Sequence, residues 1–130
     1  MQFQLTTDFL QKIEQLIAQK DGRALKELLT DFHFADIAEI LEDLKSNDAT
    51  YLIKLLESNL TSEALMELDE DVREKILERL SPKEIAEELS EMDSDDAADI
   101  VAELDDEIQK QVFDKIEDEE LAADIVELIS

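Results

Sequence analysis

The chain has no cysteine, one glycine and one proline among its 130 residues. Without cysteine it cannot form disulfides, thiolate metal sites or a cysteine nucleophile, which fits a reducing, cytosolic setting. So little glycine and proline excludes flexible linkers and the tight hairpins of an all-β fold. The sequence also lacks a secretory signal and any apolar run near the roughly 18 residues of a membrane span. We therefore expect one soluble all-α domain over residues 1–130 that does not itself span a membrane.

Basic residues are also scarce, because 12 Lys and Arg face 37 Asp and Glu, for a net charge of -25. This balance excludes a nucleic-acid partner, which would require a basic face. The acids are concentrated in the second half, where residues 61–130 hold 26 acids and 6 bases, and residues 84–107 hold twelve acids and no base. Apolar residues still recur with helical spacing, which favours a packed fold over disorder. Cations and basic surfaces are the natural partners of such a chain.

Apolar stripes with helical spacing run along the whole chain. One template returns after 36 residues, which is three units of twelve: Val72, Ile76, Leu77 and Leu80 match Ile108, Val112, Phe113 and Ile116. Other stripes are Phe9, Ile13, Leu16 and Ile17; Ile37, Ile40, Leu41 and Leu44; and Leu121, Ile125, Leu128 and Ile129. The expected helices cover residues 6–19, 23–30, 34–44, 48–57, 61–67, 70–80, 82–91, 95–103, 106–115 and 118–129.

Helix start signals lie between these stripes. In Ser81-Pro82-Lys83-Glu84, Ser81 suits the N-cap, Pro82 the first helical position and Glu84 the return bond of a capping box. Around Asp21 and Gly22 we expect one helix to end and the next to begin. Weaker N-caps are predicted at Thr6-Thr7, Asn47-Asp48, Thr61-Ser62, Asp93-Ser94 and Asp105. Short helices must bury their stripes against neighbours, so we expect successive units to stack into a superhelix.

The acidic segment contains Asp95, Asp96 and Asp99, which share one helix face at spacings of three and four residues. Each like-charge pair of this kind costs about 0.2–0.5 kcal/mol unless a cation offsets it. The helix dipole also favours Asp95 and Asp96 in a first turn, and Asp99 can simply lie on a solvated acidic face. Magnesium suits a loosely acidic face, because it prefers one or two carboxylates and keeps several waters.

Other chemistries fit the sequence poorly. An EF-hand loop is excluded because Ala98 stands where the turn requires glycine. Residues 95–99 match the DDxxD pattern of isoprenoid synthases. Those enzymes need a much larger helical bundle around a deep pocket, and a chain of 130 residues is too short for it. The lone histidine, His33, suits a cap or a partly buried position better than a metal site. No nucleophile with a base and no phosphate loop is recognisable, so we expect no enzyme.

Three segments together resemble the cytosolic N-terminal domain of MgtE-type magnesium transporters over roughly residues 24–129. They are Phe34–Leu41, Ser81–Leu89 and Asp95–Ile100. The resemblance implies a right-handed superhelix of about ten short helices at the cytoplasmic face of the cell membrane. It also implies that CBS domains, a connecting helix and a membrane pore follow in a homodimeric full-length protein, of which this chain is a fragment.

The same resemblance implies a regulatory function. Mg²⁺ held between this domain and the CBS domains would draw them together and close the pore when cytosolic magnesium is high. Carried over by position, Asp95 and Asp99, with Asp96 beside them, are the implied metal ligands, and Glu63 is a second contributor. The alternative is an acidic helical scaffold that binds a basic protein surface through electrostatic steering.

Overall fold

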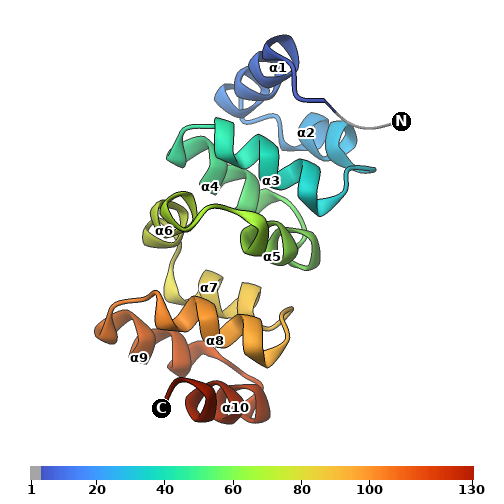
Figure 1. The fold of residues 1–130 in the computed structure, drawn as a ribbon. Helices are drawn as coiled ribbons and strands as arrows, with labels where there is room; N and C mark the ends of the chain where they lie inside the picture. The colour runs from blue at the N-terminus through green and yellow to red at the C-terminus, as the bar shows by residue number, and fades with distance from the viewer. Residues whose placement is uncertain (1–3) are drawn as a thin grey trace. The chain divides into compact units, whose positions relative to one another are not determined.

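The computed structural model describes residues 4–130, which contain ten α-helices and no strand (Figure 1). The all-α expectation is therefore confirmed, and each expected helix is present with its first residue displaced by at most three positions. The helices are α1 (Thr7–Ala18), α2 (Gly22–Leu29), α3 (Phe34–Asp43), α4 (Ser46–Leu55), α5 (Ser58–Glu67), α6 (Glu70–Glu78), α7 (Pro82–Leu89), α8 (Ser94–Ala102), α9 (Asp106–Lys115) and α10 (Glu119–Ile129).

A twelve-residue register sets where the helices begin. The first residues of α2 to α9 are spaced twelve residues apart. Helix α10 begins one residue later than this spacing would place it. Five of these helices, α3, α4, α5, α7 and α8, bury their fourth, fifth, seventh and eighth residues. In α8 those residues are Ala97, Ala98, Ile100 and Val101. This spacing places one buried stripe on each short helix, and the helix is stable because that stripe is covered by neighbours. The stripe is apolar except at Thr50, Thr61, Ser62 and Glu88.

The capping box predicted at the start of α7 is confirmed. The Ser81 hydroxyl accepts a hydrogen bond from the Glu84 amide at 3.1 Å, and the Glu84 carboxylate accepts one from the Ser81 amide at 2.8 Å. Thr6 also caps α1 as expected, with its hydroxyl accepting from the Phe9 amide. Asp93 and Asp105 occupy the N-cap positions of α8 and α9, although neither side chain makes a capping bond.

Two of the weaker N-cap predictions are wrong. Helix α4 begins at Ser46, ahead of Asn47-Asp48, and α5 begins at Ser58. Thr61 and Ser62 therefore lie buried inside α5, at the fourth and fifth positions of the register. Their hydroxyls donate to backbone carbonyls of the preceding turn, each at 3.3 Å. Burial of the shared stripe outweighed the capping tendency of these residues, because a hydroxyl can be satisfied within its own helix.

The junction between α1 and α2 is a Schellman motif. Lys20 has a φ of 56°, the Asp21 amide donates to the Leu16 carbonyl, and the Lys20 amide donates to the Ile17 carbonyl, both at 2.9 Å. One helix ends and the next begins here, as expected. The residue in the left-handed conformation is Lys20. Gly22 is instead the first residue of α2, after an N-cap at Asp21.

The described chain divides into two compact units between Arg79 and Leu80. In the first unit, α3 packs against α5, α4 against α6, and α1 against α2 and α4. The Arg73 side chain on α6 donates to the carbonyls of Leu65 (3.2 Å) and Leu68 (3.0 Å), and so caps the C-terminal end of α5. We expected one domain over residues 1–130, and that expectation stays a prediction.

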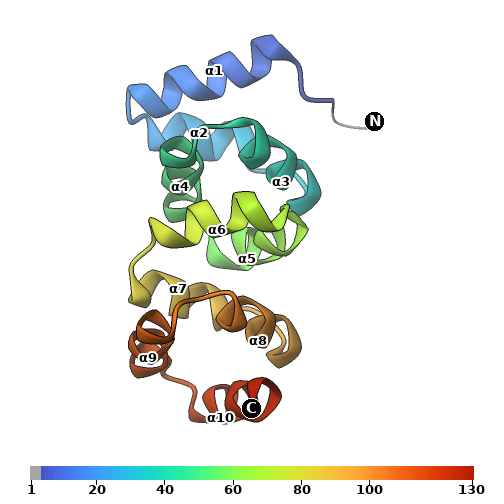
Figure 2. The ribbon, with the colours of Figure 1, turned by 60° about the vertical axis from the view of Figure 1, so that its left-hand side comes forward.

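In the second unit, α7 packs against α9 and α8 against α10 (Figure 2). The Gln109 side chain donates to the carbonyls of Val101 (2.9 Å) and Leu104 (3.1 Å) at the end of α8. These residues lie 36 positions after Arg73, Leu65 and Leu68. The second unit therefore repeats the cap of the first with a different donor.

Candidate metal-binding groove

Helix α8 presents its acids through the register that buries its apolar stripe. Asp95 and Asp96 lie in its first turn, where the amide ends of the helix favour negative charge. Because Ala97, Ala98, Ile100 and Val101 face the interior, Asp95 and Asp99 are left exposed, one turn apart. The predicted common face of these two residues is therefore present in the structure.

Both carboxylates border a groove within the second unit. Its volume is about 340 Å³, and it is lined by Asp95, Ala98, Asp99 and Ala102 of α8 and by Leu128 and Ile129 of α10. Within residues 4–130, no hydrogen bond or ion pair engages the carboxylate of Asp95 or Asp99. No counterion among the described residues therefore offsets the repulsion between the two side chains.

The apolar wall of this groove corrects one sequence expectation. We expected Leu128 and Ile129 to continue the buried stripe of Leu121 and Ile125, but they are 50% and 37% exposed, whereas Ile125 is fully buried. Helix α10 packs on α8 and has Ile125 buried, while Leu128 and Ile129 in its last turn are exposed. Periodicity identifies the apolar face of a helix but not how far the neighbouring helix extends along it.

The other two predicted ligands lie elsewhere. Asp96 is half-buried at the third position of α8, the position that Glu84 uses for capping in α7, and it does not line the groove. Glu63 is exposed on α5 in the first unit, at the position of the repeat that Asp99 occupies in α8. Of the four predicted residues, the groove brings together Asp95 and Asp99.

The donor set fits a partial magnesium site. In the part of the chain that the structure describes, no group of three or more His, Cys, Asp or Glu side chains could hold a metal ion. Two exposed carboxylates are nevertheless what Mg²⁺ takes from a protein when it keeps most of its waters. The groove offers two oxygen-donor side chains and open space for a hydrated ion.

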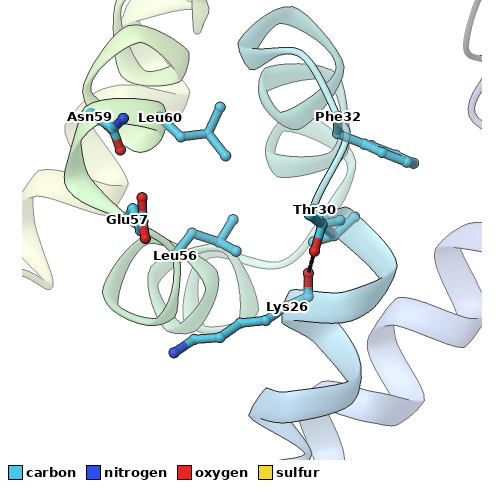
Figure 3. Close-up of a pocket in the computed structure, with 8 residues that line it drawn as sticks. Lys26, Thr30, Phe32, Leu56, Glu57, Asn59 and Leu60 are labelled. Carbon is cyan, nitrogen blue, oxygen red and sulfur yellow. Dashed lines mark hydrogen bonds between the residues drawn. The ribbon is translucent and has the colours of Figure 1, made fainter.

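A second cavity, which the sequence did not suggest, lies in the first unit (Figure 3). Its volume is about 390 Å³, and half of its lining residues are apolar: Leu29 of α2, Leu60 of α5, and Phe32 and Leu56 between helices. Lys26, Thr30, Glu57 and Asn59 add polar groups, and the Thr30 hydroxyl donates to the Lys26 carbonyl. The lining residues are Lys26, Leu29, Thr30, Phe32, Leu56, Glu57, Asn59 and Leu60.

His33 is a helix cap, as expected. It is the N-cap residue of α3, and its Nδ1 accepts a hydrogen bond from the Ala35 amide at 3.1 Å. Its ring lies against Phe34, with 4.0 Å between the ring centroids. The imidazole is therefore engaged in local structure.

Comparison with known proteins identifies the family. The model of the MgtE intracellular N domain matches residues 32–130. The chain belongs to this family. This MgtE N domain also has the fold of a solved structure, described as the soluble part of a magnesium transporter, with a TM-score of 0.76 at 20% identity.

The match to that structure covers 92% of this chain and 47% of the other, so this MgtE N domain spans about half the length of its structural relative. The search among curated proteins found no match. Within residues 4–130, no helix is long and apolar enough to cross a membrane.

Proposed function

We propose that this MgtE N domain senses Mg²⁺ and regulates a magnesium transporter of which it is one part. In this proposal, Mg²⁺ bound at Asp95 and Asp99 bridges the domain to CBS domains of the same homodimeric protein. The bridge closes the membrane pore when cytosolic magnesium is high, and the domain lies at the cytoplasmic face of the membrane. The role is binding and regulation, with no catalytic step.

The observation that carries the proposal is the unpaired state of Asp95 and Asp99 at an open groove. Two like charges one turn apart cost stability, and a divalent cation removes that cost. Because two carboxylates fill only part of the coordination shell of Mg²⁺, further oxygen ligands come from water or from a partner. A site of this kind binds its ion most tightly when the partner domain is also in place.

Asp96 and Glu63 have lesser roles in the proposal. Asp96 adds negative charge next to the groove, and Glu63 contributes a separate acidic position on α5. Since Asp96 does not line the groove, we expect its removal to weaken magnesium binding less than removal of Asp95 or Asp99.

Thermal unfolding of the 130-residue chain tests the proposal. We compare MgCl₂ with NaCl at matched ionic strength and read the difference between the two Tm values. A ligand at a hundred times its Kd stabilises the fold by about 2.7 kcal/mol, on the order of ten degrees for a chain of this size. Asp95→Asn together with Asp99→Asn should abolish the difference between the salts.

The matched control is Asp114→Asn together with Glu117→Gln. It removes the same charge from exposed positions outside the groove and should keep the magnesium effect. Equal Tm shifts in both salts, or equal losses in the two double variants, would reduce the effect to general charge screening and refute a specific site.

A further inference from the structure

Magnesium binding does not account for the exposed apolar wall of the groove. Val126, Leu128 and Ile129 are the large hydrophobic residues that α10 exposes, and Leu128 and Ile129 form a wall of the groove that carries Asp95 and Asp99. A hydrated cation gains nothing from two aliphatic side chains. Exposed apolar surface beside oriented polar groups is instead typical of a protein-binding site.

We propose that this groove binds a basic amphipathic helix of a partner protein. Two Lys or Arg side chains of that helix pair with Asp95 and Asp99, and its aliphatic side chains cover Leu128 and Ile129. This interaction goes beyond magnesium sensing, and only its competition with Mg²⁺ rests on the proposed function.

The spacing of the acids matches a helix. Asp95 and Asp99 are four residues apart on α8, which is about 6 Å along the helix axis. Two basic residues four apart on a second helix have the same spacing, so both ion pairs can form at once. Ala98 and Ala102 also line the groove, and their small side chains leave room for those of the partner. The arrangement corresponds to the helix-in-groove mode of recognition.

The negative charge around the groove favours a basic partner over a second copy of this chain or an anionic membrane. A second copy of this chain would bring another net charge of -25 against a segment with twelve acids and no base between residues 84 and 107. An anionic membrane surface is repelled in the same way. A basic partner is attracted from a distance and held by the apolar wall after contact. Because Mg²⁺ and the basic side chains use the same carboxylates, they compete.

A synthetic peptide provides the probe. It is an alanine-based helix that carries fluorescein, two Lys one turn apart and two Leu on the neighbouring stripe, and its binding to the 130-residue chain is followed by fluorescence anisotropy in EDTA. We expect saturable binding at one site. A peptide with the same charge but Gln in place of Leu should bind about tenfold more weakly, a difference of about 1.4 kcal/mol.

Variants of the chain test both walls. Leu128→Ser together with Ile129→Ser should weaken the Leu peptide about tenfold and leave the Gln peptide unchanged. Val126→Ser removes an equally exposed apolar side chain that does not line the groove, and should have no effect. Asp95→Asn together with Asp99→Asn should abolish binding of both peptides, and Mg²⁺ should displace the Leu peptide more effectively than Na⁺ at matched ionic strength.

Equal affinity for the Leu and Gln peptides, or insensitivity to the serine variant, would reduce the interaction to non-specific charge and overturn the proposal. A concentration-dependent dimer in analytical ultracentrifugation that the serine variant abolishes would assign the wall to a second copy instead. The magnesium proposal is tested independently of this one. The serine variant retains Asp95 and Asp99, so it should keep the Tm difference between MgCl₂ and NaCl even where it loses the peptide.

Discussion

Helices α5 and α6 and helices α8 and α9 are two versions of one structural element, set 36 residues apart. In both, the side chain at the fourth position of the second helix caps the first helix, Arg73 in one and Gln109 in the other. The exposed positions differ, since α5 has Asn59 and Glu63 where α8 has Asp95 and Asp99. Buried and capping positions therefore determine the repeated fold, while the exposed positions are free to carry a different charge.

The largest expected effect comes from exchanging buried residues between the two versions. Ala64 of α5 and Ile100 of α8 occupy the same register position, and both are buried. Ile100→Ala should lower the free energy of unfolding by about 2–5 kcal/mol because it leaves a cavity. Ala64→Ile should lower it by about 1–3 kcal/mol through overpacking. Urea denaturation measures both, and a loss below about 0.5 kcal/mol in either variant would mean that the two sites are interchangeable.

A smaller effect is expected at the shared cap. Gln109→Ala removes two hydrogen bonds to carbonyls at the end of α8 and should cost about 1–2 kcal/mol in urea denaturation. Gln109→Arg introduces the donor that α6 uses and should retain most of the stability. If arginine proves as damaging as alanine at this position, the equivalence of the two caps is wrong.

The smallest effect concerns the starts of α7 and α8. Ser81 forms a capping box, whereas Asp93 occupies the same place without a side-chain bond. Ser81→Ala should therefore cost about 1 kcal/mol, and Asp93→Ala should cost less, because only its charge near the helix dipole is lost. Thermal unfolding would rank the two, and the reverse order would contradict the difference between these caps.

The sequence predicted most of the fold because each helix carries its own signal. The stripe of Ile37, Ile40, Leu41 and Leu44 is buried in full. The twelve-residue register even includes α2, which begins before the residues matched by the family model. The caps expected at Asn47-Asp48 and Thr61-Ser62 failed because the local capping tendency competes with burial of the shared stripe. Tertiary packing decided both cases.

The candidate site was only half predicted. The spacing of Asp95 and Asp99 indicated one acidic face, because that depends on a single helix. The apolar wall of Leu128 and Ile129 depends on how α10 packs against α8, which no local pattern encodes. The division of the chain after Arg79 likewise reflects contacts between helices, and no flexible linker marks it in the sequence.

A magnesium titration of the isotope-labelled chain, followed through its backbone amide resonances, tests the central claim most directly. We predict that MgCl₂, beyond matched NaCl, shifts the amides of Asp95–Asp99 in α8 and changes those of Asn59–Glu63 in α5 much less. The same titration of the Asp95→Asn, Asp99→Asn variant should lose the α8 response. Shifts of equal size in both helices, or spread evenly over the acidic residues, would contradict a specific magnesium site in the groove.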